Sequence, residues 1–313
     1  MGTGRVSHSY TPNYVGTDIL AHGIVSLQGA TPLATSLDTA GIFSRDPELW
    51  ARAAKALYGA EISFGYQNPS KVYTIGFPSN DSTPLNSLFK SFLVNLTSHL
   101  SATDEELDLN AKWAEHDSNP LSSLLNHTYE VITGREQGAL VRPQLYSDYA
   151  SANGGRRPFV DPRPLDRWAF GDASPSLEEG LANKTTFMNW FTTKILFHDE
   201  KACSQAILAY VPRTPATKYR DAYLTGPSQP YPFATGRISV MSGVPDMVVT
   251  IGEVEYQSKI TKTTEHLPVT VDLMAARGCD GALFDIITGM YEKGMLPKVK
   301  TGRSLVTGGE ILT

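Results

Sequence analysis

LPVTVDLMAARGCDGALFDI, residues 267–286, is the stretch of sequence that decides the fold class. Its first ten residues are mostly apolar and predict a strand, which leads into a helix that begins near Cys279-Asp280. A second apolar run, MVVTIGEV at 247–254, predicts another strand shortly before it. Strands that alternate with helices are typical of α/β proteins.

The same alternation continues toward the N-terminus. Ser44-Arg-Asp46-Pro47 and Ser82-Thr83-Pro84 are typical helix starts, because each offers a capping side chain and a proline for the first turn. Further strands are expected at 71–77 and 206–212, a broken helical pattern from 104 to about 146, and a helix at 177–197. We therefore predict an α/β fold with a mixed, twisted sheet flanked by helices.

One segment interrupts this pattern. Residues 151–175 contain Gly154-Gly155, several prolines and a mixture of Arg and Asp. Such a composition predicts an irregular excursion, either on the surface or as a lid. We treat residues 1–313 as one partial domain that carries this excursion.

The charge balance excludes some partners. The chain has 27 Lys and Arg against 32 Asp and Glu, a net charge of −5. Nucleic-acid binding needs clustered positive charge, and the nearest cluster, Arg156-Arg157, is expected in a solvated loop. No run of eighteen apolar residues occurs, so we expect no membrane span. The polar N-terminus and the presence of two cysteines predict a reducing, cytoplasmic location without a disulfide scaffold.

The short motifs that bind phosphate, dinucleotides or zinc, and the G-x-S-x-G elbow of serine hydrolases, are missing. We predict no cofactor and no metal site. Isolated residues have plainer interpretations as turn, helix-end or core residues than as catalytic groups, although Cys279 at a helix start and His266 before a strand stay candidates. The residues weighed in this way are Ser242, His116-Asp117, His198-Asp199, His266 and Cys279.

Two blocks of the chain resemble the amidase signature family. GIVSLQGATPLATSLDTAGIFSRD, residues 23–46, is similar to a family segment in which a G-x-V-S strand is followed by S-[LF]-D-T-x-G and an arginine. SVMSGVPDMVVTIGEV at 239–254, together with residues 267–286, looks like the family's G-x-P strand and its later L-P-V strand with an Asp-initiated helix. The amino-acid sequence of these blocks is most similar to that of fungal members of the family. Some of these carry a name linked to scytalone dehydratases of pigment metabolism.

The resemblance implies a single α/β/α domain that hydrolyses amide bonds. Members of the family use a serine nucleophile, a second serine on a cis peptide bond and a lysine. A hydroxyl needs a base at hydrogen-bond distance to become a nucleophile, and backbone N–H groups of the glycine-rich loop stabilise the oxyanion. The implied substrate is a small amide.

The chain departs from the family at the nucleophile. Val15-Gly16-Thr17-Asp18 looks like the start of the family's G-[ST]-D-T-G-G-S stretch, but Ile19 follows and the T-G-G-S is missing. Ser7 and Ser9 lack a glycine-rich context, and no lysine precedes Lys55. No catalytic residue is therefore transferred, and the binding residues are left open.

Two interpretations follow from this departure. The chain is either a truncated gene product of an amide hydrolase, or a pseudoenzyme that keeps the pocket as a binding module. A third, a role in fungal pigment or secondary metabolism, rests on naming alone. Without the N-terminal strands of the family, the sheet is expected to expose an edge, which predicts an oligomer or a partner chain that completes the sheet.

Overall fold

A seven-stranded mixed sheet runs through the middle of the computed structural model, which describes residues 16–19, 22–212, 214–217, 219, 226 and 233–310. The strands lie in the order β2-β1-β8-β9-β7-β3-β4. β3 pairs in parallel with β4 and β7, whereas the other neighbouring pairs are antiparallel. The strands are β1 (Gly16–Ile19), β2 (Phe43–Ser44), β3 (Lys71–Ile75), β4 (Thr103–Glu106), β7 (Ile207–Tyr210), β8 (Asp246–Gln257) and β9 (Thr264–Met274). The predicted α/β fold is confirmed.

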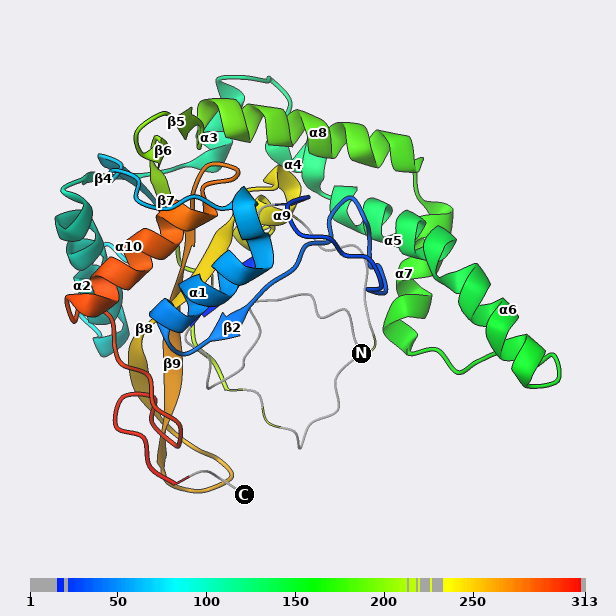
Figure 1. Cartoon of the computed structure of the whole chain (residues 1–313). Coiled ribbons are helices and arrows are strands. Elements are labelled where there is room, and N and C mark those ends of the chain that lie inside the picture. Colours follow the sequence, from blue (N-terminus) through cyan, green and yellow to red (C-terminus); the bar gives the residue numbers. More distant parts are fainter. Residues whose placement is uncertain are drawn as a thin grey trace.

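Helices cover both faces of this sheet (Figure 1). One face carries α1 (Pro47–Tyr58), α2 (Pro84–Leu100) and α10 (Asp280–Glu292). The other carries α3 (Leu109–Ala114), α4 (Leu121–Leu125), α5 (Thr128–Leu140), α8 (Leu177–Lys194) and α9 (Ile238–Ser242). β7 shows how the sheet separates two cores, since Ile207 and Ala209 pack with the first set and Leu208 and Tyr210 with the second.

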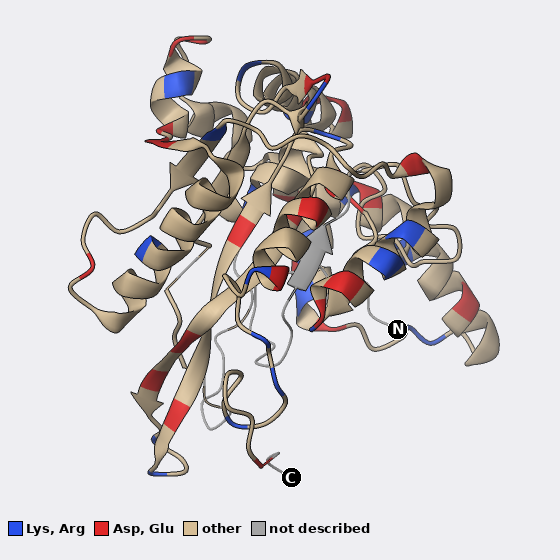
Figure 2. Cartoon of the chain, turned by 60° about the vertical axis from the view of Figure 1, so that its left-hand side comes forward, with Lys and Arg blue, Asp and Glu red and all other residues tan. Residues whose placement is uncertain are grey.

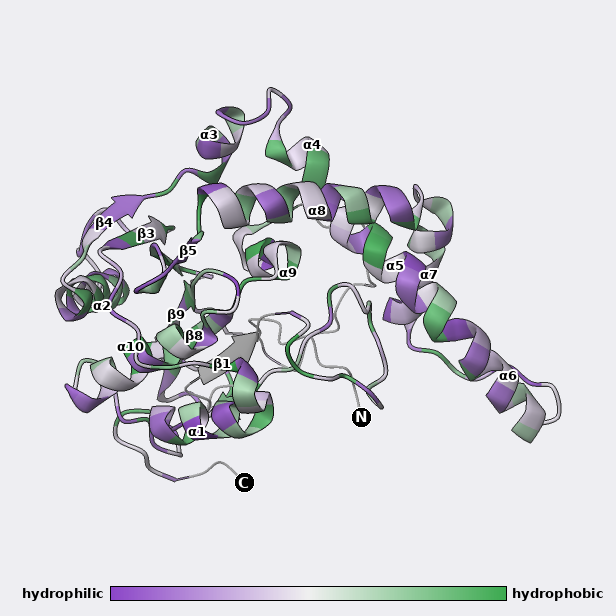
Figure 3. Ribbon diagram, turned by 45° about the horizontal axis from the view of Figure 1, so that its top comes forward, coloured by the Kyte–Doolittle hydropathy of each residue, from purple (hydrophilic) through white to green (hydrophobic). Residues whose placement is uncertain are grey.

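Two further helices, α6 (Arg142–Ala152) and α7 (Pro162–Ala173), continue outward from α5. Figure 3 shows hydrophobic and hydrophilic residues mixed along this arm, which extends away from the sheet. None of the described α6 side chains is buried, whereas Trp168 and Gly171 of α7 are buried against Gln137 and Gly134 of α5. α7 therefore packs on α5, and α6 is largely solvated.

The helix starts expected from the sequence are confirmed by their caps. The Asp46 carboxylate accepts a hydrogen bond from the Leu49 N–H at 2.9 Å, and the Thr83 hydroxyl accepts one from the Asn86 N–H at 3.1 Å. Gly59 ends α1 with a positive φ of 61°. These local signals worked because a cap and a proline act within one turn of backbone.

Three local expectations need correction. Residues 104–106, expected to start a helical pattern, belong to β4 because their backbone pairs with β3, which outweighs the local preference for helix. Much of the segment 151–175, expected to be irregular, is α7, which starts where the Asp161 carboxylate accepts from the Arg163 N–H. Gly16, Thr17 and Asp18, likened with Val15 to the start of the nucleophile stretch, lie in strand β1, which pairs with β2 and β8.

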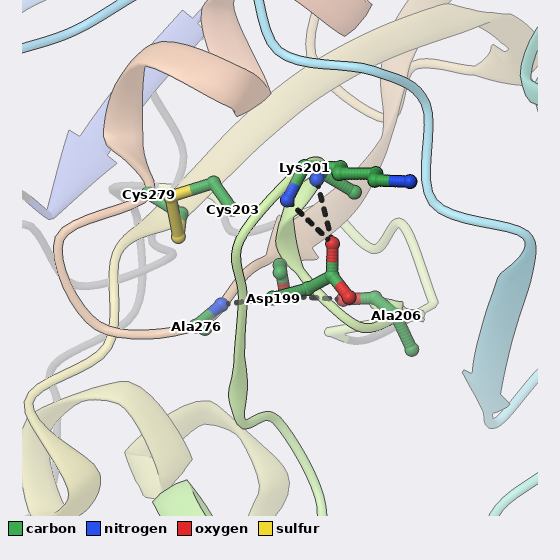
Figure 4. The surroundings of a disulfide bond; sticks show 8 residues. Asp199, Lys201, Cys203, Ala206, Ala276 and Cys279 are labelled. Atoms are coloured by element: carbon green, nitrogen blue, oxygen red, sulfur yellow. Dashed lines mark hydrogen bonds between the residues drawn. A yellow bond between two sulfur atoms is a disulfide. The ribbon is translucent and has the colours of Figure 1, made fainter.

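The two cysteines do not stay reduced. Cys203 of the short hairpin β5 (His198–Asp199) and β6 (Cys203–Ser204) forms a disulfide with Cys279, the residue before α10 (Figure 4). The fold brings their Cα atoms to 5.6 Å although 76 residues separate them, and spacing alone did not show this. Disulfides persist in oxidising compartments, so this bond weighs against the reducing, cytoplasmic location expected from the sequence.

The described edges of the sheet are short or charged. β2 has two residues, and all four residues of β4, Thr103–Glu106, are exposed. Charged residues on an edge strand discourage further strand pairing. In Figure 2, Lys and Arg lie interspersed with Asp and Glu over the helices. No helix within the described ranges has both the length and the apolar character that crossing a bilayer requires.

Candidate functional site

The two blocks that carry the sequence resemblance meet in one pocket. It encloses about 260 Å³ between the loop after β1 (dark blue in Figure 1), α8, the end of α9 and the end of β9. The first block supplies most of the wall, while Gly243 and Arg277 come from the second block and α8 adds Lys184 and Met188. The complete lining is His22, Gly23, Val25, Leu27, Thr35, Ser36, Asp38, Lys184, Met188, Gly243 and Arg277.

Two acidic side chains, the half-buried Asp38 and the buried Glu136, hold the loop that forms the pocket wall. The Asp38 carboxylate accepts hydrogen bonds from the backbone N–H groups of Leu33 and Ala34 at 2.9 and 3.1 Å. Glu136 of α5, 7% exposed, accepts from the Thr35 hydroxyl at 3.0 Å and from the Ser36 N–H at 3.2 Å. Charge-assisted bonds of this kind are stronger than neutral ones. They fix residues 33–38 against α5 and so shape the pocket.

Two cationic side chains, Lys184 and Arg277, also line the pocket. Arg277, in the turn after β9, donates from Nη2 to the His22 carbonyl at 3.2 Å and from Nη1 to the Met188 sulfur at 4.0 Å. Lys184 lies one helical turn before Met188, so that both project from the same side of α8. Gly243, with a positive φ of 74°, allows the close approach, since a Cβ there would lie 3.9 Å from both His22 and Arg277.

The pocket shifts the protonation of its residues. Burial, reinforced by the charges of Lys184 and Arg277, lowers the pKa of His22 to about 4, so its imidazole is neutral at pH 7. Burial and the Arg277 charge also lower the pKa of Lys184, while Glu136 acts in the opposite sense. The pKa of Asp38 is raised, mainly by burial. Perturbed groups gathered in one pocket are a mark of a ligand or catalytic site.

Two polar atoms in this pocket are buried without a hydrogen-bond partner, the His22 Nε2 and the Ser36 hydroxyl oxygen. A buried polar group without a partner costs stability, so it calls for an explanation such as a ligand. Among the described residues, however, no serine hydroxyl donates to a lysine or histidine nitrogen. The described pocket therefore offers binding groups but no activated serine of the kind that the family uses.

A second, larger cavity of about 410 Å³ lies between β3 and α8. Two of its charged groups, Lys112 and Glu115, form an ion pair with each other at 3.1 Å. It includes neither of the two resembling blocks. Size alone favours this cavity, but the pocket beside Lys184 has the polar atoms without partners and is the better candidate.

The residues weighed from the sequence lie outside the pocket and have structural roles. Ser242, expected in a turn, is the last residue of helix α9, and its hydroxyl donates to the Ile238 carbonyl one turn earlier at 2.6 Å. His266 lies on β9 with its Nε2 3.8 Å from the Glu255 carboxylate. His116 lies in the turn after α3, where its N–H donates to the Trp113 carbonyl at 2.8 Å. His198 belongs to the β5–β6 hairpin rather than to a helix end. Ser7 and Ser9 lie outside the described residues.

His198 also lies beside the disulfide. Its ring and the sulfurs of Cys203 and Cys279 fall within 4.8 Å of one another, a spacing compatible with metal ligation. Both sulfurs are bonded to each other. Since a cysteine ligates a metal as a thiolate, this group holds no metal while the disulfide is intact.

No protein-family model matches the chain. Solved structures do match it: an amidase (19% identity, TM-score 0.55) and the peptide amidase of Stenotrophomonas maltophilia (14%, TM-score 0.54). The chain has the fold of these amidases. A 6-aminohexanoate cyclic dimer hydrolase, 14% identical with a TM-score of 0.56, shares it. These matches cover 90%, 92% and 90% of this chain, but 58%, 60% and 61% of the three matched chains.

The pocket residues come from segments that are distant in the sequence and meet only in the fold, so sequence patterns did not identify them. Arg277 follows the apolar end of β9, at the strand ends where α/β sheets commonly place ligands, and this position was the one available signal. His22 directly precedes the first resembling block. Lys184 carries no local signal, since only the packing of α8 brings it beside Arg277.

Proposed function

We propose that the chain descends from amide hydrolases and binds a small amide-like molecule in the pocket beside Lys184, without hydrolysing it. One observation carries the proposal: the two segments that resemble the amidase signature family, far apart in the sequence, line the same pocket. The amidase fold of the structural neighbours supports the ancestry. Polar atoms without partners at Ser36 and His22 support ligand binding.

The absence of turnover is proposed from the chemistry of the described residues. Hydrolysis by this family needs a hydroxyl activated by a neighbouring base, and no described serine hydroxyl donates to a lysine or histidine nitrogen. Ser239 and Ser304 donate to the carboxylates of Asp246 and Glu253, outside the pocket. The neutral imidazole of His22, with a pKa of about 4, is too weak a base at pH 7 to serve as an effective substitute. The chain covers less than two thirds of each matched amidase. Both interpretations of the sequence, a gene-model fragment and a pseudoenzyme, agree with this proposal.

The test combines binding with turnover. Purified chain is incubated with benzamide and butyramide, ammonia release is measured, and binding is followed by calorimetry. We expect binding without ammonia. Met188→Trp, which fills the pocket, is expected to abolish binding, whereas Val94→Trp on the exposed side of α2 leaves it unchanged. Turnover that a serine-directed fluorophosphonate abolishes would show that the chain has a nucleophile and would overturn the proposal of inactivity.

Three wider assignments belong to the same proposal. The sequence of the two resembling blocks is similar to that of fungal members linked to pigment metabolism, and this similarity supports a fungal origin. A cytoplasmic location predicts reduced cysteines, whereas the structure has a disulfide between Cys203 and Cys279. Alkylating free thiols inside intact cells and counting the modified cysteines tests this location. An oligomer or a partner chain that completes the sheet is tested by the mass in solution, since β2 and β4 end the described sheet.

A further inference from the structure

Lys184 is a cation without a direct counter-ion. Its side chain is partly buried in the pocket wall, yet it forms no hydrogen bond or ion pair with any described residue. Removing a charge from water costs free energy unless an opposite charge or a hydrogen bond compensates it. The lowered pKa of Lys184 reflects that cost. A negatively charged group from a ligand would therefore stabilise the Lys184 ammonium group.

Arg277 is positioned beside it with hydrogen-bonding capacity to spare. Its guanidinium is exposed at the mouth of the pocket and is held by the His22 carbonyl and the Met188 sulfur. A guanidinium carries five N–H donors, so most of them stay available. Arginine binds planar carboxylates through two parallel hydrogen bonds.

The neighbouring acids do not neutralise this end. Asp38 and Glu136 each accept two hydrogen bonds from the wall loop, from Leu33 and Ala34 and from Thr35 and Ser36 respectively. Glu136 influences the pKa of Lys184 from a distance but is not within 4.0 Å of its ammonium group. The two acids are thus engaged by the backbone and side chains of residues 33–36, and no described acid forms an ion pair with Lys184 or Arg277.

We propose that Lys184 and Arg277 bind the carboxylate of a small organic acid, whose apolar part lies against Val25, Leu27 and Met188. The inference rests on the proposed function, because it names the chemical class of the ligand for the same pocket. The neutral imidazole of His22, whose Nε2 has no partner, is available as a further donor to the carboxylate. The pocket volume of about 260 Å³ suits a small molecule.

Benzoate and benzamide test the proposal, because they have nearly the same shape and differ in charge. Calorimetry measures the affinity of each, and of inorganic phosphate, for the full chain at pH 7 and low salt. A hydrogen bond to a charged group contributes more than a neutral one, so benzoate is expected to bind about tenfold tighter than benzamide or more. Phosphate is expected to bind more weakly than benzoate.

Variants assign this preference to the two cations. Lys184→Met is expected to weaken the binding of benzoate more than that of benzamide, and so to remove the preference for benzoate. Arg277→Gln, at an exposed position that tolerates substitution, is expected to weaken benzoate binding in the same way and serves if Lys184→Met does not fold. Lys201→Met removes the same charge from an exposed turn outside the pocket and should bind as the parent does.

The outcomes separate this inference from the proposed function. Equal affinity for benzoate and benzamide, or a preference that survives in both Lys184→Met and Arg277→Gln, overturns the carboxylate site but leaves an amide-binding pocket standing. Phosphate that binds more tightly than benzoate overturns the assignment to a carboxylate. Binding of none of the three probes overturns both proposals.

Discussion

His22 shows how one side chain couples the pocket to pH. Its imidazole is mostly buried next to Lys184 and Arg277, and its pKa is lowered to about 4 from an ordinary value of 6.5. Well above pH 6.5 the folded and unfolded chains both carry a neutral imidazole, so the titration of His22 does not change stability there. As the pH falls from 6.5 to 4, the unfolded chain binds the proton and the folded chain does not, so stability is lost.

We therefore expect His22→Gln to make folding less sensitive to acid. The parent should lose up to about 3 kcal/mol between pH 6.5 and 4 through His22, at about 1.4 kcal/mol for each unit of pKa shift. Urea unfolding across that range measures the slope in both proteins. Asp38 and the other carboxyl groups titrate in both, so the difference reports His22. Identical slopes would show that His22 is not held neutral.

The buried ion pair of Arg237 and Glu130 is a second feature at this scale. Their side chains are 8% and 2% exposed, and Arg237 Nη2 lies 2.6 Å from the Glu130 carboxylate. The guanidinium also stacks over the ring of Tyr129, with 4.5 Å to its centroid. A pair removed so completely from water tolerates the loss of either partner poorly.

Arg237→Met is expected to destabilise the chain by about 3–5 kcal/mol, because Glu130 is left as an uncompensated buried charge. Chemical denaturation measures the change. The matched control is Arg142→Met, which breaks the solvent-exposed bidentate pair with Asp172 and should cost about 0–1 kcal/mol. Equal effects of the two substitutions would contradict the distinction between buried and exposed pairs.

At the scale of elements, two glycines determine how closely α5 and α7 approach. A Cβ at Gly134 would lie 2.6 Å from the Arg167 carbonyl oxygen and 2.8 Å from the Cα of Gly171. Both obstacles are backbone atoms and cannot rotate away. Small residues at a helix crossing let the two backbones approach closely, and here they hold α7 on α5 and thereby anchor the arm.

Gly134→Ala is expected to destabilise the fold by about 1–3 kcal/mol through overpacking, although alanine favours helix more than glycine does. Hydrogen exchange of the α7 amides should rise with it, since the arm loosens first. Gly138→Ala on the same helix is the control: its Cβ would make an ordinary contact at 3.7 Å with the Arg142 side chain, and stability should stay equal or increase. The same loss in both variants would contradict this account of the crossing.

At the scale of the whole molecule, the disulfide joins two parts of the chain that lie 76 residues apart in the sequence. Cys203 lies in the β5–β6 hairpin, whose turn is held by the Asp199 carboxylate accepting from two backbone N–H groups (Figure 4). Cys279 lies at the start of α10. The Ser204 hydroxyl accepts from the Ala276 N–H at 2.8 Å, so the two regions also meet without the sulfur bond.

The Cys203→Ala/Cys279→Ala variant is expected to lose about 4 kcal/mol of stability, because the cross-link restricts a long loop in the unfolded chain. Urea unfolding of the parent with and without dithiothreitol should show the same loss, and the reductant should have no effect on the variant. Mass spectrometry after alkylation counts the free thiols. Two alkylated cysteines in the non-reduced, folded parent would contradict the bond.

The sequence by itself determined the elements and their class. Caps such as Asp46 and Thr83 and apolar runs such as 267–276 act through neighbours within a turn or a strand, so the α/β fold and most boundaries follow from them. The two blocks that resemble amidases pointed to the fold that the structural neighbours share. Each of these signals depends on interactions between residues that are close together in the sequence.

The tertiary structure decided everything that depends on distant residues meeting. Strand pairing made β4 from a segment with helical character, and the disulfide formed across 76 residues. The pocket is the clearest case, because Lys184 can contribute to a binding site only when Arg277 lies beside it. The two meet because α8 packs on α9 and on the loop that forms the pocket wall. Burial and the charges of neighbours, not residue type, created the lowered pKa values there.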